Sequence, residues 1–227
     1  RRVLFRSQER RMLMKKGCIL CLLISVISLP LIAQNIIYSN LKELLTQHGD
    51  TTAVLRVEKR SRNQIVLTGG ADYRITAGDD ESMCRRLKKR CFAVRDEKGN
   101  LYLNCRKLRY KKLRFGAWYA PAVQLGKNIY FCAMPLGSVI GGNFVEEDDV
   151  KLGGNIGDAL AASSLVTKRV CYELNGETGK VDFLGTDRML QLLKNYPELK
   201  QAYLKDDSQE AKHTFKYLLE LQNKQKK

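Results

Sequence analysis

Three stretches of the sequence each consist of two apolar runs separated by a short turn rich in glycine and asparagine. They span residues 91–105, 117–135 and 168–185, with turns at Lys98-Gly99-Asn100, Gly126-Lys127-Asn128 and Asn175-Gly176. Such a pattern is typical of β-hairpins, because glycine and asparagine tolerate the backbone angles of a tight turn. The chain is therefore expected to build much of its sheet from neighbouring antiparallel strands.

Helical patterns flank these hairpins, and the longest lie at the C-terminal end. Residues 39–49 and 79–90 predict short helices, whereas residues 186–225 contain consecutive amphipathic helical segments, one of which begins at Pro197. Further strands are expected over residues 53–60, 64–69 and 72–77. Strands mostly within 53–184 followed by helices predict an α+β fold with a mainly antiparallel sheet.

Residues 14–33 have the three-part pattern of a secretory signal peptide. Two lysines after Met14 precede an apolar run over residues 18–31, and Leu-Ile-Ala leads up to Gln34. The run is shorter than the roughly 20 residues of a membrane-spanning helix. We expect residues 1–33 to be removed, with 1–13 upstream of the true start, and residues 34–227 to form a single exported domain in the periplasm, at the outer-membrane surface or outside the cell. A retained N-terminal anchor is the alternative.

The excess positive charge is confined to one stretch. Residues 85–114 hold 13 basic and 2 acidic residues, whereas the rest of the chain after residue 33 holds 20 basic and 21 acidic. The segment "RKLRYKKLRFGAWYAPA" (106–122) joins bases to aromatic residues, which can bind phosphate or sulfate groups and stack on rings. The candidate anion- or partner-binding residues are Arg106, Arg109, Lys111, Lys112, Arg114, Trp118 and Tyr119.

A solvated sheet edge explains the same stretch without a ligand. Lysines on an edge strand prevent sheet-to-sheet aggregation, and a lone tryptophan is commonly part of the core. Pro121 favours an edge or a bulge for the strand that follows, because proline cannot donate to a sheet ladder. Both interpretations remain open from the sequence.

Five cysteines follow residue 33, and an exported chain can form disulfides. The pairing expected first is Cys84–Cys91 or Cys91–Cys105, although spacing does not decide connectivity. Because five is odd, at least one thiol is free or pairs between chains.

Catalytic and metal-binding signals are weak. The two histidines, His48 and His213, have no cysteine or carboxylate at metal-ligand spacing, so no metal site is expected. The segment "GETGK" (176–180) lacks the glycine spacing and the final Ser or Thr of a phosphate-binding loop. We expect no cofactor and no enzymatic activity, with an envelope hydrolase using scattered carboxylates as the alternative. Another alternative is self-association through a small-residue ridge at Gly153, Gly157 and Ala161.

Distinctive segments carry a resemblance to a group of known proteins. They are "MKKGCILCLLISVISLPLIAQ", "NCRKLRYKKLRFGAWYAPA…IYFCAMPLGSV" and "TKRVCYELNGETGKVDFLG" followed by "LLKNYPELKQAYL". With them the chain resembles exported proteins of unknown function from Bacteroidota, including secreted proteins of gut Bacteroides. The resemblance implies export from a two-membrane bacterium and supplies no active site.

Together these features predict a non-enzymatic binding or interaction protein. The expected partner is an anionic glycan, lipopolysaccharide or an acidic protein, whereas nucleic acid is not the natural partner of an exported chain. No transmembrane span is expected after the leader. The oligomeric state does not follow from the sequence.

Overall fold

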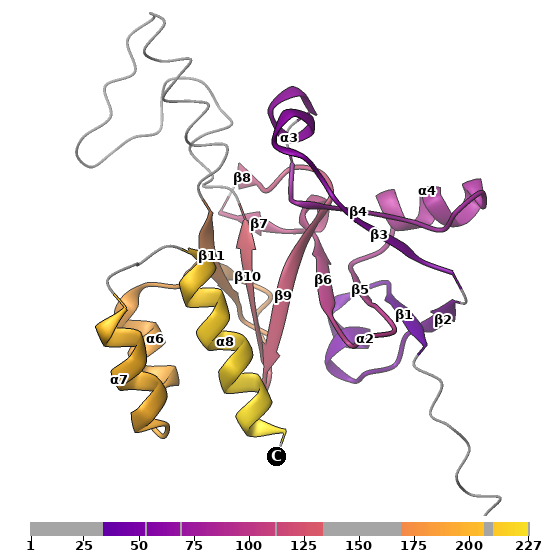
Figure 1. Cartoon of the computed structure of the whole chain (residues 1–227). Coiled ribbons are helices and arrows are strands. Elements are labelled where there is room, and N and C mark those ends of the chain that lie inside the picture. Colours follow the sequence, from indigo (N-terminus) through magenta and orange to yellow (C-terminus); the bar gives the residue numbers. More distant parts are fainter. Residues whose placement is uncertain are drawn as a thin grey trace, which may run out of the picture. The chain divides into compact units, whose positions relative to one another are not determined.

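The computed structural model describes residues 34–52, 54–68, 70–111, 113–133, 169–206 and 211–226 (Figure 1). The described strands are β1 (Asn35–Tyr38), β2 (Asp50–Thr52), β3 (Arg56–Lys59), β4 (Tyr73–Thr76), β5 (Ala93–Arg95), β6 (Leu101–Asn104), β7 (Arg109–Tyr110), β8 (Leu113–Arg114), β9 (Tyr119–Leu125), β10 (Asn128–Ala133), β11 (Val170–Leu174) and β12 (Val181–Phe183). The described helices are α2 (Leu41–Leu45), α3 (Arg62–Thr68), α4 (Glu81–Lys89), the 3₁₀ turn η1 (Cys105–Lys107), α6 (Thr186–Leu192), α7 (Pro197–Lys205) and α8 (Ala211–Gln225). The expected signal segment (1–33) and the ridge at Gly153, Gly157 and Ala161 lie outside the described residues.

The predicted α+β class and mainly antiparallel sheet are confirmed. The three expected hairpins are β5–β6, β9–β10 and β11–β12, all antiparallel. The strands follow the order β12-β11-β10-β9-β6-β5-β1-β2, and the β3–β4 ribbon joins the sheet where Tyr73 of β4 pairs with Tyr119 of β9. Helices α6, α7 and α8 follow the last described strand, β12, as expected.

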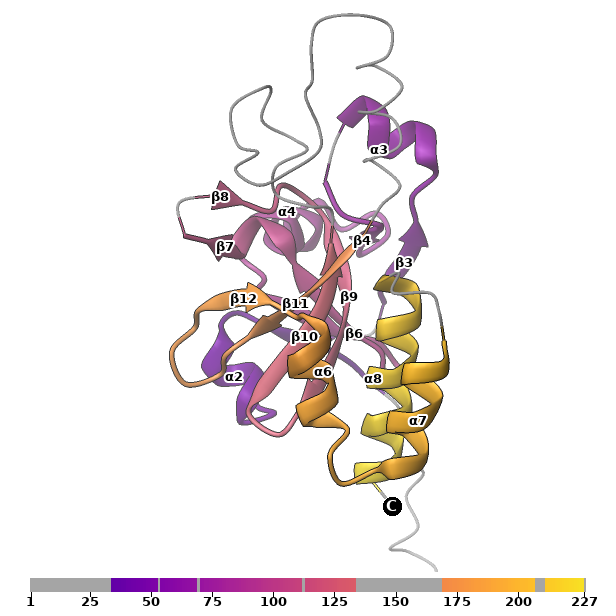
Figure 2. The same ribbon diagram turned by 90° about the vertical axis from the view of Figure 1, so that its left-hand side faces the viewer.

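The alternation of side chains along the strands produces two buried faces. On one face, residues such as Ala122 and Phe131 pack with Leu44 of α2. On the other, Val123 and Tyr130 pack with α6, α7 and α8. Figure 2 shows β9, β10 and β11 between α2 on one side and α7 and α8 on the other. Because both faces are covered, β9 and β10 are apolar at nearly every position.

Strand β9 is central, so the edge position suggested by Pro121 is wrong. It pairs with β6 along one side and with β10 and β4 along the other. The β9–β10 pairing covers Ala122 to Leu125, whereas Tyr119 pairs with β4. Pro121 therefore lies where β9 passes from one neighbouring strand to the other. A residue without an N–H is tolerated there because the strand is changing partner.

Residues 62–68 form a helix, although a strand was expected over 64–69. Ser61 and Gln64 cap it reciprocally: the Gln64 N–H donates to Ser61 Oγ at 3.3 Å, and the Ser61 N–H donates to Gln64 Oε1 at 2.9 Å. This Ser-x-x-Gln capping box satisfies two backbone donors that would otherwise lack partners. The cap outweighs the β-branched residues that favoured a strand.

The disulfide joins Cys132 to Cys171, so the expected Cys84–Cys91 bridge is not formed. Cys132 and Cys171 lie directly opposite each other on β10 and β11, with Cα atoms 4.2 Å apart. Cys84 lies on α4, where its thiol bonds to Gly78 O, while the buried Cys91 thiol bonds to Ala93 O. Cys105 is also free, which excludes the Cys91–Cys105 alternative.

Candidate functional site

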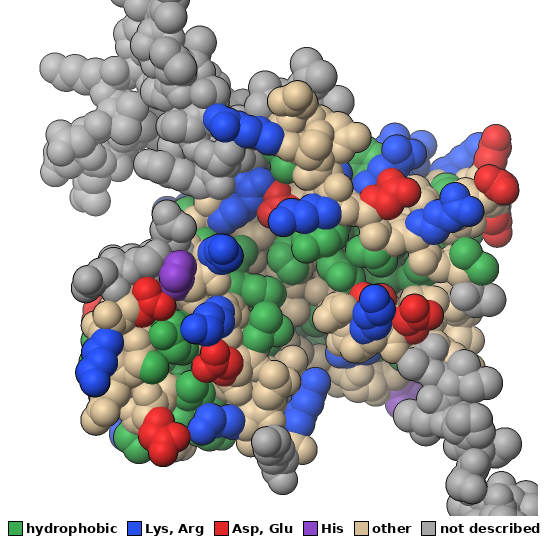
Figure 3. Space-filling model, in the orientation of Figure 1, with side chains coloured by type: hydrophobic (Ala, Val, Ile, Leu, Met, Phe, Trp, Pro, Cys, Tyr) green, Lys and Arg blue, Asp and Glu red, His purple; other side chains and the backbone are tan. Residues whose placement is uncertain are grey.

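A cavity of about 340 Å³ opens where β3, β4, α4, η1 and the loop before β9 meet. Its lining residues are Arg56, Glu58, Arg74, Ile75, Thr76, Gly78, Cys84, Lys88, Asn104, Arg106, Ala117, Trp118 and Tyr119. On the face seen in Figure 3, lysine and arginine side chains lie over the region of β3, β4 and α4, with Asp and Glu side chains among them. The charged residues of the lining come from four separate elements, β3, β4, α4 and η1.

The β3–β4 ribbon supplies four polar residues to the cavity lining, all on one face of the ribbon. Arg56 pairs with Thr76, and Glu58 pairs with Arg74. Residues two apart on a strand point to the same side, and so do residues directly opposite each other on its partner. The four side chains therefore share one face of the ribbon, while the intervening Val57 packs into the core.

Helix α4 contributes Lys88 and is fixed at both ends. At its start, the Asp80 carboxylate accepts a 2.9 Å hydrogen bond from the Met83 N–H, which lowers the pKa of Asp80. At its end, the Leu87 carbonyl accepts hydrogen bonds from Tyr119 Oη (2.8 Å) and Asn104 Nδ2 (3.2 Å). Carbonyls of a last helical turn need such partners. These contacts fix the end of α4, from which the exposed Lys88 extends, to β6 and β9.

Asn104 also positions Arg106. It is 1% exposed, and its Nδ2 donates to Cys91 O at 2.9 Å. Its Oδ1 accepts from the Arg106 N–H at 3.1 Å and caps η1. Arg106 itself is exposed, so a buried amide fixes the backbone from which this guanidinium enters the cavity lining.

Trp118 contacts two guanidiniums. The Arg60 Cζ lies 5.2 Å from its ring centroid, and Arg74 Cζ lies 5.6 Å from it. Arg60 is held by hydrogen bonds to Ala71 O (2.7 Å) and Gln64 O (2.9 Å). Trp118 has a φ of 75°, in a region that costs a bulky residue energy and is often found at functional sites.

Tyr119 has a structural role in this arrangement. Its side chain is 2% exposed and its hydroxyl is used in the bond to Leu87 O. Burial raises the pKa of Tyr119 well above its ordinary value. The hydroxyl therefore remains a neutral donor that anchors α4.

Charge in the cavity is unbalanced. Four cationic side chains (Arg56, Arg74, Lys88, Arg106) accompany one carboxylate, Glu58. Within the described part of the chain, none of these five side chains takes part in an ion pair. A surplus of positive charge in a concave site attracts anions.

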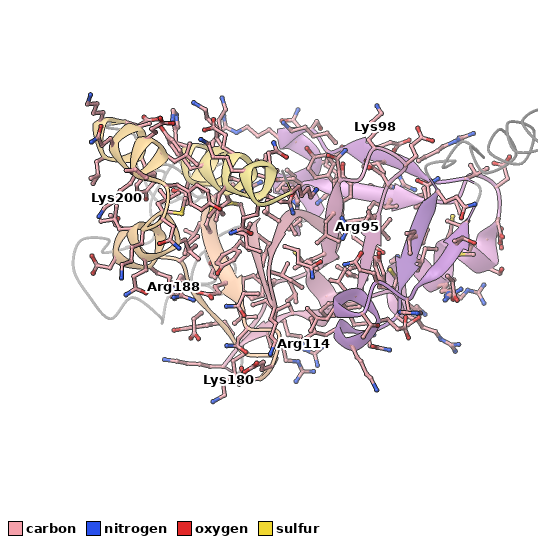
Figure 4. The ribbon with its side chains drawn as sticks, turned by 90° about the horizontal axis from the view of Figure 1, so that it is seen from below. Arg95, Lys98, Arg114, Lys180, Arg188 and Lys200 are labelled. Carbon is pink, nitrogen blue, oxygen red and sulfur yellow. A yellow bond between two sulfur atoms is a disulfide. The ribbon has the colours of Figure 1, made fainter. Side chains whose placement is uncertain are left out.

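The residues predicted from the sequence fall into two groups. Arg106, Trp118 and Tyr119 line the cavity. Arg109 and Arg114 lie opposite each other on the small β7–β8 ribbon, and Lys111 Nζ lies 5.3 Å from the Tyr110 ring. Lys112 lies outside the described residues. In Figure 4, Arg114 and Lys180 extend on the side of the sheet away from α7 and α8.

Sequence reasoning missed Arg56, Glu58, Arg74 and Lys88 as a set. Lys88 lay within the charge-rich stretch, but the other three come from strands with ordinary composition. The available signal was the alternation of charged and apolar residues in "RVEK" and "YRIT", which marks one polar face.

The described residues contain no cluster of three or more His, Cys, Asp or Glu side chains suited to a metal ion. His213 Nδ1 lies 2.9 Å from Asp206 Oδ2, away from the cavity lining. Nor does any described helix have the length and apolar character needed to cross a membrane.

Comparison with known proteins assigns the chain to a family. The model of a family of unknown function, DUF6563, matches residues 36–225. The chain belongs to this family. No curated protein and no solved structure matches it. Every residue lining the cavity falls within the part matched by the DUF6563 model.

Proposed function

We propose that this DUF6563 protein is an exported, non-enzymatic module that binds an anionic ligand in the cavity between β3, β4, α4 and η1. The observation that carries the proposal is the convergence of Arg56, Arg74, Lys88 and Arg106 on one cavity. Guanidinium groups bind carboxylate, sulfate and phosphate oxygens through paired hydrogen bonds. The Trp118 ring restricts Arg74 before any ligand arrives, which reduces the entropy lost on binding.

A binding role suits the lining better than hydrolysis. Glu58 is the single carboxylate among the lining residues that the structure describes. Acid–base hydrolysis of a glycoside commonly uses a pair of carboxylates, one on each side of the bond that breaks. The cavity therefore supports recognition of charge rather than bond cleavage.

Export is proposed from the leader-like residues 14–33 and from the resemblance to Bacteroidota proteins. The Cys132–Cys171 disulfide supports it, because disulfides persist in oxidising compartments such as the periplasm. Fractionation of cells that express the whole gene tests this part. Recovery of the full-length chain in the cytoplasm, with the leader uncut, would contradict it.

Binding is tested with a short heparin oligosaccharide, a densely anionic probe. Because Trp118 is the single tryptophan in the sequence, its emission reports on the cavity directly. The double variant Arg74→Ala/Arg106→Ala is expected to bind at least tenfold more weakly, since each lost charged hydrogen bond weakens binding appreciably. The affinity of the parent protein should also fall as salt concentration rises.

The matched control is Arg109→Ala/Arg114→Ala, which removes the same charge from the β7–β8 ribbon. It should retain most of the affinity. If this variant loses binding and the cavity variant does not, the ligand lies on the ribbon and the proposed site is wrong. Both variants are first compared with the parent by circular dichroism, so that only folded proteins are scored.

A further inference from the structure

We infer that the cavity recognises an acidic carbohydrate, a sugar carrying a carboxylate or sulfate group as well as free hydroxyls. The inference rests on the proposed anion-binding function and narrows it to one ligand class. The observation behind it is the carboxylate of Glu58 in the cavity lining, because a site for a simple anion does not need a negative charge.

Glu58 stands directly opposite Arg74 in the β3–β4 register, yet the two side chains form no ion pair. Glu58 is also exposed and lines the cavity together with the four cationic residues. A carboxylate so placed repels sulfate or phosphate. Its presence favours a ligand that also brings hydrogen-bond donors.

Sugar hydroxyls are such donors. An ionised carboxylate only accepts hydrogen bonds, and its two oxygens can hold neighbouring hydroxyls. Arginine side chains can only donate, so they select the acidic group of the same ligand. The ribbon places Glu58 beside Arg74 and close to Arg56 and Thr76, which puts an acceptor among donors on one face.

The size and lining of the cavity agree with a small sugar. About 340 Å³ lies at the lower end of the range of small-molecule sites. Its lining combines charged side chains with apolar surface from residues such as Ile75, Ala117 and Trp118. Such a mixture suits a sugar, whose ring carries both hydroxyl groups and apolar C–H groups.

The test compares two probes, a digalacturonate and inorganic sulfate, on the parent protein and on Glu58→Gln. Trp118 emission is the readout for all titrations. With an acidic sugar as the true ligand class, Glu58→Gln binds digalacturonate about tenfold more weakly, because a charged acceptor is lost. The same variant binds sulfate a few-fold more tightly, because a nearby like charge is removed. Glu97→Gln, on the exposed β5–β6 turn, is the control and changes neither.

The outcomes separate this inference from the proposed function. Opposite changes for the two probes support it. If Glu58→Gln binds both probes more tightly, weakens both, or leaves digalacturonate unchanged, the acidic-sugar inference is overturned while anion binding stands. If the parent protein binds neither these probes nor heparin oligosaccharide, the proposed function itself fails.

Discussion

The guanidinium carbon of Arg74 lies 5.6 Å from the centre of the Trp118 ring, and that of Arg60 lies 5.2 Å from the same ring. Contacts of this kind are worth about 0.5–1 kcal/mol each at exposed sites. The indole ring of Trp118 therefore contacts two positively charged guanidinium groups. The backbone of Trp118 is in the left-handed region, with a φ of 75°.

Replacing Trp118 separates the role of its ring from that of its backbone. Trp118→Ala and Trp118→Gly both remove the ring, and both are expected to weaken binding of heparin oligosaccharide because Arg74 loses its contact. Titration calorimetry measures this binding, since both variants lack the tryptophan emission. Glycine adopts a φ of 75° without the steric cost that alanine meets there. Trp118→Gly should therefore have a free energy of unfolding about 1 kcal/mol above that of Trp118→Ala. Urea denaturation measures the difference, and equal stabilities would argue against backbone strain.

Comparing Gly70 with Gly78 tests how tightly Gly70 packs against the loop before β9 that carries Ala117 and Trp118. Both have positive φ, at 83° and 62°. A Cβ on Gly70 would lie 2.4 Å from Ala117 O, whereas one on Gly78 meets nothing within 4 Å. We expect Gly78→Ala to cost about 1 kcal/mol of stability and Gly70→Ala about 3 kcal/mol or more, from backbone strain plus overpacking. Urea unfolding tests this, and similar costs at the two positions would contradict the close approach.

The Cys132–Cys171 disulfide closes a loop with a sequence separation of 39 residues. Restricting an unfolded loop of that size contributes about 3–4 kcal/mol in the chain-entropy account. The double variant Cys132→Ala/Cys171→Ala should lose about that much in urea unfolding without reductant. A variant as stable as the oxidised parent would show that the bridge is not formed.

Thiol labelling of a chain that starts at Gln34 checks the same pairing. In the native state Cys84 should react, since it is only partly buried. Cys91 and Cys105 should stay unlabelled, because burial raises the pKa of these thiols to about 11 and about 12. In denaturant without reductant, labelling should reach the three free cysteines and no others.

Glu173 ties β11 to α6 and gives the fold a pH dependence. Arg188 Nε and Nη2 each donate to its carboxylate at 2.8 Å, and Tyr130 donates at 3.0 Å. These bonds, first those from Arg188, lower the pKa of Glu173 below its ordinary value of 4.5. A depressed folded-state pKa adds stability above the unfolded pKa, and that stability is lost as pH falls through the folded pKa.

The measurement is the free energy of unfolding of the parent and of Arg188→Gln between pH 7 and pH 3. Because Arg188 is 42% exposed, its contribution is expected to be only about 1 kcal/mol at pH 7. The difference between the two proteins should shrink as pH falls below the ordinary pKa of about 4.5 and then through the lower folded-state pKa of Glu173. A difference that stays constant down to pH 3 would exclude the ion pair as its source.

The hairpins could be predicted because their signals are local. An apolar run, a turn with Gly99, Gly126 or Gly176, and a second apolar run lie within about 20 residues. The helix at 62–68 was missed although Ser61 and Gln64 carry its start signal in adjacent sequence. The disulfide was missed for another reason: Cys132 and Cys171 become neighbours only when β10 pairs with β11.

The sequence alone determined the α+β class, the antiparallel hairpins and the helical C-terminal end, because periodicity and turn chemistry act over short distances. It also located the excess charge, but not the site. The tertiary structure decided which bases meet: Arg106 and Lys88 join Arg56 and Arg74 at the cavity, whereas Arg109 and Arg114 face each other on a separate ribbon. Strand pairing brings residues from distant segments onto one face, and the local composition of each segment carries no record of its partner.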